Sequence, residues 1–212
     1  AYIVLALVLG ALGWFFWAPF FLYDQASVRQ MFFWVGILSA FAAPALSMGL
    51  LADEKRSGTI ELLITLPVRD HEVVLGKFLG VLGLYGVLAL LTIPYPIAVA
   101  QFGPLEAGPV MTGYFGLVLQ GGAMLAIGLM ASSFTENQVV AFFVSLTITM
   151  IFVLIDKQAA LLWGPLQWFA FGTHSGPMER GVIDLRDVVF FLSITALCLG
   201  ITFRSLESRR WS

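Results

Sequence analysis

Long, nearly unbroken apolar blocks alternate with short polar segments along the chain. A helix rises 1.5 Å per residue, so about 20 apolar residues cross a hydrocarbon core of about 30 Å. Six blocks approach this length, and because they are continuously apolar they predict helices, whereas the strands of a membrane barrel would alternate. The expected fold is an all-α polytopic membrane protein with one transmembrane domain, residues 1–212, and six spans at about residues 1–22, 31–52, 73–100, 110–133, 139–155 and 188–203.

The composition supports a lipid environment and excludes several classes of function. Hydrophobic residues make up 59% of the chain and charged residues 11%, whereas soluble domains carry about 25% charged residues. The net charge of −2 gives no reason to expect a nucleic acid as a partner. A single cysteine, Cys198, provides neither a disulfide framework nor a cysteine metal site. The chain starts at Ala1 inside an apolar block, and we expect that it has been trimmed.

Basic residues predict the orientation of the chain in the membrane. Lys and Arg are enriched in cytoplasmic loops, and their distribution here is uneven. We therefore expect the loop at residues 53–72 and both termini in the cytoplasm, and the loop at residues 156–187 outside. The cytoplasmic group is Lys55, Arg56, Arg69, Lys77, Arg204, Arg209 and Arg210, and the outer group is Arg29, Lys157, Arg180 and Arg186.

The predicted spans carry almost no charge. The basic residue inside a span is Lys77, about one turn in, and we expect it to snorkel to the interface. Since intramembrane charges mark ion and proton paths, a proton-coupled carrier is disfavoured, and energy for transport would enter from outside the bilayer. Small residues at helical spacing predict faces for close helix packing. These are Gly76, Gly80 and Gly83 on the third span, and Gly122 and Ala126 on the fourth.

The loop between the second and third spans predicts a short amphipathic helix. Gly58 can serve as its N-cap, which places Glu61 in the first turn, and the helix should end before Pro67. A helix of about two turns is too short to be stable alone. Its apolar residues must therefore lie on the membrane surface or on a cytoplasmic subunit.

Two motifs give this chain a resemblance to a known family. Residues 54–68 read Glu-Lys-Arg-Ser-Gly-Thr-Ile-Glu-Leu-Leu-Ile-Thr-Leu-Pro-Val, and Val74-Leu75-Gly76-Lys77-Phe78 follows. This stretch resembles the central motif of ABC-2 type transporter permeases. Residues 180–187, Arg-Gly-Val-Ile-Asp-Leu-Arg-Asp, resemble the gliding-motility-associated (GldF-type) branch of that family, which also occurs in bacteria that do not glide.

The resemblance implies a permease subunit of an ATP-driven transporter, an exporter in a bacterial cytoplasmic (inner) membrane. In this family two permeases pair, and each loop helix docks onto a separate cytoplasmic ABC ATPase subunit. The chain itself would then bind no cofactor and would not be an enzyme, with ATP and Mg²⁺ held by the ATPase. A Walker A pattern is missing from the sequence, because Gly76-Lys77 is followed by Phe78. The residues implied in coupling are Glu54, Arg56, Gly58, Thr59, Glu61, Leu63 and Pro67.

The outer loop predicts an interfacial element followed by a charged segment. Its first half is apolar with Trp163 and Trp168, which suits aromatic anchoring at the membrane interface. Its charges are expected first to cap the last helix and hold the loop, and second to contact a partner or an extruded substrate. They are Arg180, Asp184, Arg186 and Asp187.

Two other functional classes compete with a transporter permease. An intramembrane enzyme would need paired catalytic groups, and Thr173-His174-Ser175-Gly176 lacks the first glycine of the G-x-S-x-G nucleophile motif. A non-transporting membrane anchor that uses the same ATPase for a mechanical or assembly task fits the sequence as well as a transporter does.

Overall fold

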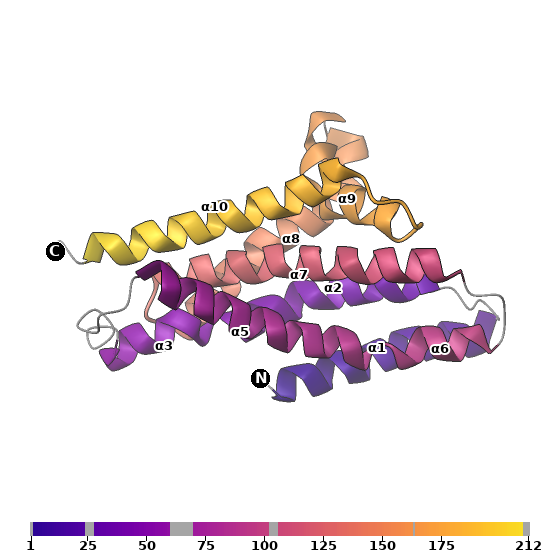
Figure 1. Ribbon diagram of the computed structural model, residues 1–212, viewed down its shortest axis with the longest axis horizontal. Coiled ribbons are helices and arrows are strands. Elements are labelled where there is room, and N and C mark those ends of the chain that lie inside the picture. Colours follow the sequence, from indigo (N-terminus) through magenta and orange to yellow (C-terminus); the bar gives the residue numbers. More distant parts are fainter. Residues whose placement is uncertain (1, 24–27, 60–69, 102–105, 163, 210–212) are drawn as a thin grey trace.

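The computed structural model describes residues 2–23, 28–59, 70–101, 106–162 and 164–209 (Figure 1). These residues form helices and connecting turns, without a strand among them. The helices are α1 (Tyr2–Tyr23), α2 (Val28–Ser47), α3 (Gly49–Ser57), α5 (Asp70–Leu91), α6 (Pro94–Ala100), α7 (Ala107–Phe134), α8 (Gln138–Leu162), the 3₁₀ helix η1 (Gly164–Phe169), α9 (Phe171–Met178) and α10 (Leu185–Arg209).

Helix occupies each of the six predicted spans, and the all-α membrane fold is confirmed. Five helical segments in the described part of the chain are long and apolar enough to cross a bilayer, and α1 adds a shorter apolar stretch, Tyr2–Trp17. The boundaries differ from the prediction at several places. The second span continues into α3, the third is divided into α5 and α6, and α8 and α10 extend beyond the predicted ends at residues 155 and 203.

The division of the third span follows from its prolines. Pro94 has no backbone N–H and stands at the first position of α6, where that N–H would have no helical partner anyway. The preceding turn is held by the Thr92 hydroxyl, which donates to the Ala89 carbonyl at 2.7 Å. The polar backbone at this break is therefore satisfied locally, as lipid surroundings require.

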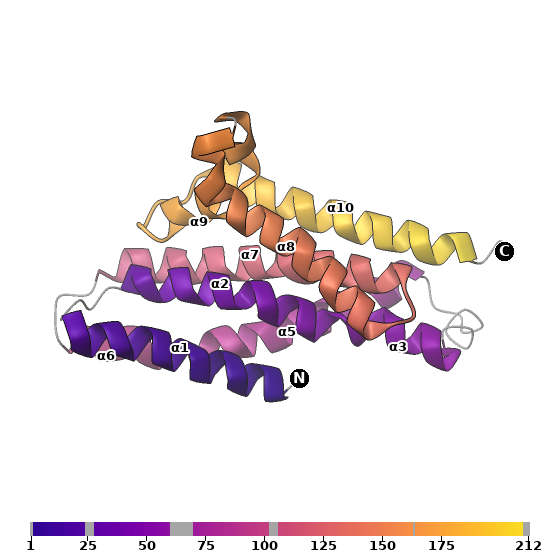
Figure 2. The ribbon, with the colours of Figure 1, turned by 180° about the vertical axis from the view of Figure 1, so that it is seen from behind.

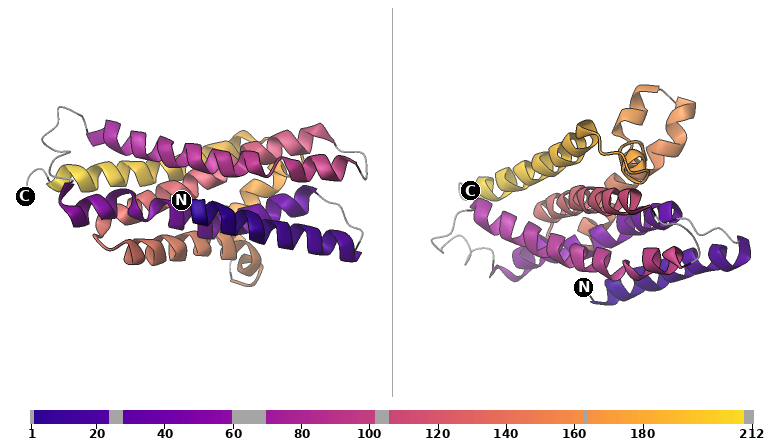
Figure 3. Two further views of the ribbon diagram at one scale, coloured as in Figure 1. Left: turned by 90° about the horizontal axis from the view of Figure 1, so that it is seen from below. Right: turned by 45° about the vertical axis from the view of Figure 1, so that its right-hand side comes forward.

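Helix α7 lies at the centre of the bundle, and the other long helices pack around it. Of its most apolar window, 78% is buried, against 17–50% for the other long spans. It contacts α2 and α10 most extensively, and also α5, α8, α9 and α3. Figures 1 and 2 show α10 on one side of α7, with α2 and α1 on the other, and Figure 3 shows α5 and α8 on opposite sides of the bundle.

Glycines on α7 allow this close packing. A Cβ added at Gly121 would overlap the ring of Tyr85, and one added at Gly113 would overlap the ring of Phe32. Gly122 is buried beside Leu82, 3.6 Å from the position of its missing Cβ, and Ala126 is also fully buried. The fourth span therefore provides the close-packing face that its small residues predicted.

The glycines of the third span behave differently. Gly76, Gly80 and Gly83 lie on an exposed face of α5, and a Cβ added at any of them would meet no neighbour within 4 Å in the described chain. This face therefore has no neighbour within the described part of the chain, and its role in close helix packing stays a prediction. The glycine spacing predicted a helix face without bulky side chains, but spacing alone does not show whether another helix packs against that face.

The bundle has two distinct ends. One, which we call the α3 end, carries α3, the first turn of α5, the turn between α7 and α8, and the C-terminal end of α10 (Figure 1). The other, which we call the α9 end, carries the start of α2 together with η1, α9 and the start of α10. The C-terminus lies at the α3 end, whereas α1 begins partway along the bundle (Figures 1 and 2).

Candidate functional site

Helix α3 forms the base of the predicted coupling loop. Pro44 interrupts the hydrogen bonding of α2 because it has no N–H, and α2 gives way to α3 through a single turn residue, Met48. The Met48 N–H still donates to the Pro44 carbonyl at 2.9 Å. The second span thus continues through the nine residues of α3, Gly49–Ser57, which carry polar side chains from Asp53 onward.

Gly58 ends α3. Its φ is +70°, and its N–H donates to the Lys55 carbonyl at 3.3 Å. This left-handed conformation is inexpensive only for glycine, which makes Gly58 a typical C-terminal helix cap. Gly58 therefore closes the helix before it, a role that the sequence pattern did not predict, and its prediction as the N-cap of the following helix stays a prediction. The segment with Glu61, Leu63 and Pro67 lies outside the described residues.

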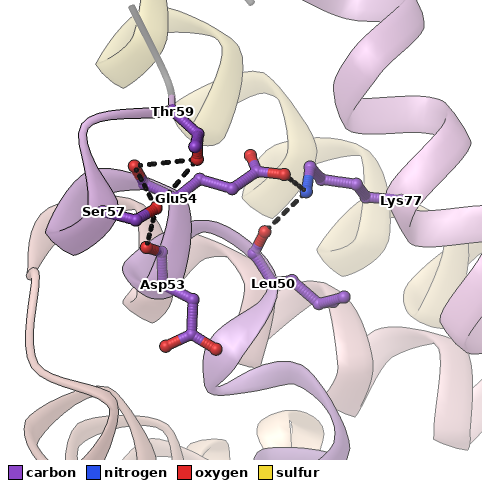
Figure 4. A network of polar contacts seen from close by, with 6 residues as sticks. All are labelled: Leu50, Asp53, Glu54, Ser57, Thr59 and Lys77. Carbon is purple, nitrogen blue, oxygen red and sulfur yellow. Dashed lines mark hydrogen bonds and ion pairs between the residues drawn. The ribbon is translucent and has the colours of Figure 1, made fainter.

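Two hydroxyl side chains secure the end of α3. The Ser57 hydroxyl donates to the Asp53 carbonyl at 2.8 Å and lies 2.9 Å from the hydroxyl of Thr59. Thr59 in turn donates to the Glu54 carbonyl at 3.4 Å (Figure 4). The last four carbonyls of a helix have no intrahelical partner, and the bond from Thr59 gives one to Glu54, while the bond from Ser57 adds a second donor at Asp53.

Lys77 connects α5 to α3. Its amine donates to the Leu50 carbonyl at 2.7 Å and forms an ion pair with Glu54 Oε1 at 2.5 Å (Figure 4). Both side chains are largely buried, at 19% and 27% exposure, and Glu54 Oε2 is buried. The expectation that Lys77 snorkels to the membrane interface stays a prediction, and the structure adds the partners of its amine. Lys77 points to the neighbouring helix, where a carboxylate and a carbonyl replace water.

Lys55 connects α3 to the C-terminal end of α7. Its side chain is 7% exposed, and its amine donates to the Ser133 carbonyl. The Ser205 hydroxyl of α10 donates to the same carbonyl at 3.1 Å. A cation at a helix C-terminus is favoured because the unpaired carbonyls there carry partial negative charge. Three helices, α3, α7 and α10, therefore meet at one backbone oxygen.

A third contact joins α3 to α8. The Gln138 side-chain amide donates to the Asp53 carboxylate, and Gly49 leaves room for that carboxylate, since a Cβ there would lie 2.8 Å from Asp53 Oδ2. We call these three contacts the clasp. It consists of Lys77 with Glu54 and Leu50, Lys55 with Ser133, and Gln138 with Asp53.

The clasp includes residues that sequence reasoning missed. Lys55 was interpreted only as a cytoplasmic charge, although it follows Leu51 by four residues and both are buried on one face of α3. Among the implied coupling residues, Glu54 belongs to the clasp, whereas Arg56, Gly58 and Thr59 are exposed at the tip of α3. Arg56 also lines a shallow hollow with residues 134–137 of the α7–α8 turn.

The α9 end is held by a buried histidine. His174 Nδ1 lies 2.6 Å from Asp187 Oδ1, and its Nε2 lies 2.9 Å from the Trp168 carbonyl oxygen. The ring also stacks on Phe190 at 3.9 Å between centroids. Because both ring nitrogens are engaged, neither remains to take a proton from a hydroxyl. His174 is a structural link between η1, α9 and α10, in contrast to the histidine of a serine hydrolase.

Other charges of this loop also hold structure. Asp184 Oδ1 accepts the Arg186 N–H at 3.0 Å and so caps the start of α10. The Arg186 guanidinium lies 3.6 Å above the Trp168 ring, in a cation–π contact. Asp187 binds His174, so three of the four predicted outer-loop residues serve the capping and holding role expected first. Arg180 is exposed, and its side chain lines a cavity.

These features define a polytopic membrane protein whose polar links gather at the two ends of a helical bundle. The chain belongs to the ABC-2 family of transporter proteins, since the family model matches residues 15–203, most of its length. It is therefore the membrane-spanning permease component of an ABC transporter, a component that is generally not itself catalytic. No curated protein matches the chain.

Proposed function

We propose that this permease is driven by a separate ABC ATPase subunit that docks at the α3 end and transmits its movement through the clasp. The clasp carries the proposal, because it ties the first residues of the coupling loop to α5, α7 and α8 at once. A short exposed helix end that is bound to several spans can pass on a displacement without bending. Loosely attached loop residues could not.

The remaining parts of the proposal follow from the family. ATP and Mg²⁺ are bound by the partner ATPase, and this chain pairs with a second permease, identical or homologous. The complex works as an exporter in a bacterial cytoplasmic membrane, with the α3 end in the cytoplasm. The motif at residues 180–187 supports the gliding-motility-associated branch.

Transmission through the clasp can be tested apart from docking. Lys77→Met keeps the length of the side chain but removes its amine, so Glu54 loses its ion pair and the Leu50 carbonyl loses its second donor. We expect the ATPase still to co-purify, while the ATP-dependent change in distance between spin labels on exposed Leu90 of α5 and Leu197 of α10 decreases strongly. Arg204→Met, on the exposed side of α10, is the matched control.

Docking is tested by Leu63→Asp, a substitution chosen from the sequence motif. A charge in an apolar contact costs on the order of a few kcal/mol, so the ATPase should no longer co-purify. Val182→Asp, exposed at the α9 end, should have no effect.

An unchanged spin-label response in Lys77→Met would contradict transmission through the clasp, and full co-purification with Leu63→Asp would contradict the docking site. A response to ATP without movement of any cargo would favour the membrane-anchor alternative.

A further inference from the structure

A cavity of about 760 Å³ lies between α2, α7, α8 and α9 at the α9 end. Ligand sites of drug-sized molecules have volumes of about 300–1,000 Å³. The lining of this cavity is charged at one end and apolar elsewhere. Arg29, Glu179 and Arg180 lie at one end, whereas Ile37, Phe41 and Leu154 belong to the apolar remainder.

A buried amide without a partner faces this cavity. Gln120 of α7 is 8% exposed and lines the cavity wall, and it forms no hydrogen bond with any residue that the structure describes. Gly36 of α2 lies beside it, with the position of a Cβ there 3.5 Å from Gln120 Nε2. A largely buried amide in a native protein normally has a hydrogen-bond partner, and the amide of Gln120 is reached from the cavity, so a group bound in the cavity would supply that partner.

The charges at the polar end favour an anion. Arg29 and Glu179 approach each other at 3.8 Å, and their charges balance. Arg180 is exposed at the same end and forms no ion pair with the described residues. The end of the cavity therefore carries a net positive charge, and a guanidinium is well suited to bind phosphate or carboxylate.

The apolar part of the cavity opens toward the lipid-facing side of the bundle. Phe33, Phe41 and Leu154 line it, and their side chains are 41%, 48% and 54% exposed. Along α2, Gly36 lies about 10 Å from Arg29, and Phe41 lies about 18 Å from it, at 1.5 Å per residue. A ligand would thus meet a cation first, the Gln120 amide next, and then an apolar channel.

We propose that this cavity binds an amphiphile with an anionic head group, an ester or amide link and an acyl chain. The head binds Arg180, the link accepts a hydrogen bond from Gln120, and the chain lies between α2 and α8. A lipid of the surrounding bilayer and a transported amphiphile share this chemistry. The binding site itself does not depend on the proposed function, whereas a role as cargo rests on it.

The site is tested with the permease in phosphatidylcholine nanodiscs and radiolabelled palmitoyl lysophosphatidic acid as the probe. We expect saturable binding that palmitoyl lysophosphatidylcholine displaces poorly and glycerol 3-phosphate does not displace. Arg180→Glu should lower the affinity about tenfold or more, as loss of a charged hydrogen bond does. Arg204→Glu, at the opposite end, is its control and should bind normally.

Filling the cavity provides an independent test. Gly176 lines it, and a Cβ there has open space, so Gly176→Phe should block the probe while leaving thermal stability near that of the wild type. Gly200→Phe on α10 also enters open space but lies away from the cavity, and should bind normally. Gln120→Leu should weaken binding with the chain unchanged. Binding that does not saturate, or that survives both Arg180→Glu and Gly176→Phe, would overturn the site.

The source of the amphiphile is decided in the complex with the ATPase. Stimulation of ATP hydrolysis by the probe, lost in Gly176→Phe, identifies a cargo site. Saturable binding without stimulation identifies a resident membrane lipid, and the site stands. Failure of the ATPase to dock, with probe binding intact, would contradict the proposed function and leave this inference in place.

Discussion

At the residue scale, three side chains that can carry positive charge end on backbone carbonyls. Lys55 donates to Ser133, Lys77 donates to Leu50, and His174 Nε2 lies at the Trp168 oxygen. Each carbonyl lies near a helix end or a turn, where intrahelical bonding is incomplete or shared. Each of these side chains therefore gives its carbonyl a hydrogen-bond partner in addition to, or in place of, the helix.

The first prediction concerns the histidine link. His174→Phe keeps the aromatic ring against Phe190 but removes both polar contacts, and it leaves the buried Asp187 carboxylate without its partner. An unpaired buried group costs about 1–3 kcal/mol, and more when it is charged. We expect a clearly lower midpoint of thermal unfolding in detergent. The double variant His174→Phe/Asp187→Leu, which also removes the carboxylate, should recover part of the loss. If the single variant were as stable as the wild type, the link would be unimportant for the fold.

At the element scale, α7 shows how one helix organises the others. Its glycines leave out side-chain volume where α2, α5 and α9 approach. Near its end at Phe134, the Ser133 carbonyl accepts hydrogen bonds from Lys55 and Ser205. Helix α5 carries glycines at similar spacing, but they face outward from the described bundle. Close packing of two helices thus depends on whether a neighbouring helix lies against the face, as well as on the small residues of that face.

The second prediction compares glycines on these two helices. Gly121→Ala would drive a methyl group into Tyr85, whose ring is 1% exposed and whose hydroxyl lies 2.7 Å from that of Ser39. Overpacking of this kind costs about 1–3 kcal/mol, so the unfolding midpoint should fall. Gly83→Ala enters open space and should leave it unchanged or raise it, because alanine favours helix by up to about 1 kcal/mol.

One result for these two variants would contradict this prediction. A loss of stability in Gly83→Ala equal to that in Gly121→Ala would show that the α5 face is packed in the assembled protein. In that case, Gly83→Leu should also change the oligomeric state measured by light scattering in detergent.

At the scale of the whole molecule, the two ends of the bundle differ in their chemistry. The α3 end holds the clasp and the exposed tip of α3, whereas the α9 end holds the histidine link and the mouth of the cavity. Figure 1 shows these ends separated by the full length of α10. The proposed docking of the ATPase and the proposed binding of an amphiphile would therefore take place at opposite ends of the bundle.

The third prediction is the orientation of these ends. From the distribution of basic residues, we expect Ser57 and Ser208 in the cytoplasm, and Gly103, which lies outside the described residues, and His174 on the other side. His174 is 4% exposed, so Val182, 58% exposed in the same loop, is the better position for a label. In a Cys198→Ala background, an impermeant maleimide should label Val182→Cys in intact cells but not Ser57→Cys. Labelling of Ser57→Cys would reverse the orientation.

The sequence by itself determined the fold class and the family. Apolar blocks of membrane-crossing length lead to helices because lipid leaves the backbone no other way to satisfy its polar groups, and the motif at residues 54–68 pointed to the ABC-2 family. Local signals also indicated that charges of the outer loop cap the last helix, as Asp184 does, and that Gly122 and Ala126 lie on a packing face. Each of these depends on residues close together in the chain.

Only the tertiary structure decided which neighbours those residues meet. It paired Lys77 with Glu54, left Gly76, Gly80 and Gly83 without a neighbour in the described bundle, and made Gly58 the end of α3. It also placed Gln120 beside a cavity that four helices enclose. The physical reason is that burial and electrostatic pairing are set by contacts between distant segments, which the periodicity of a single helix does not contain.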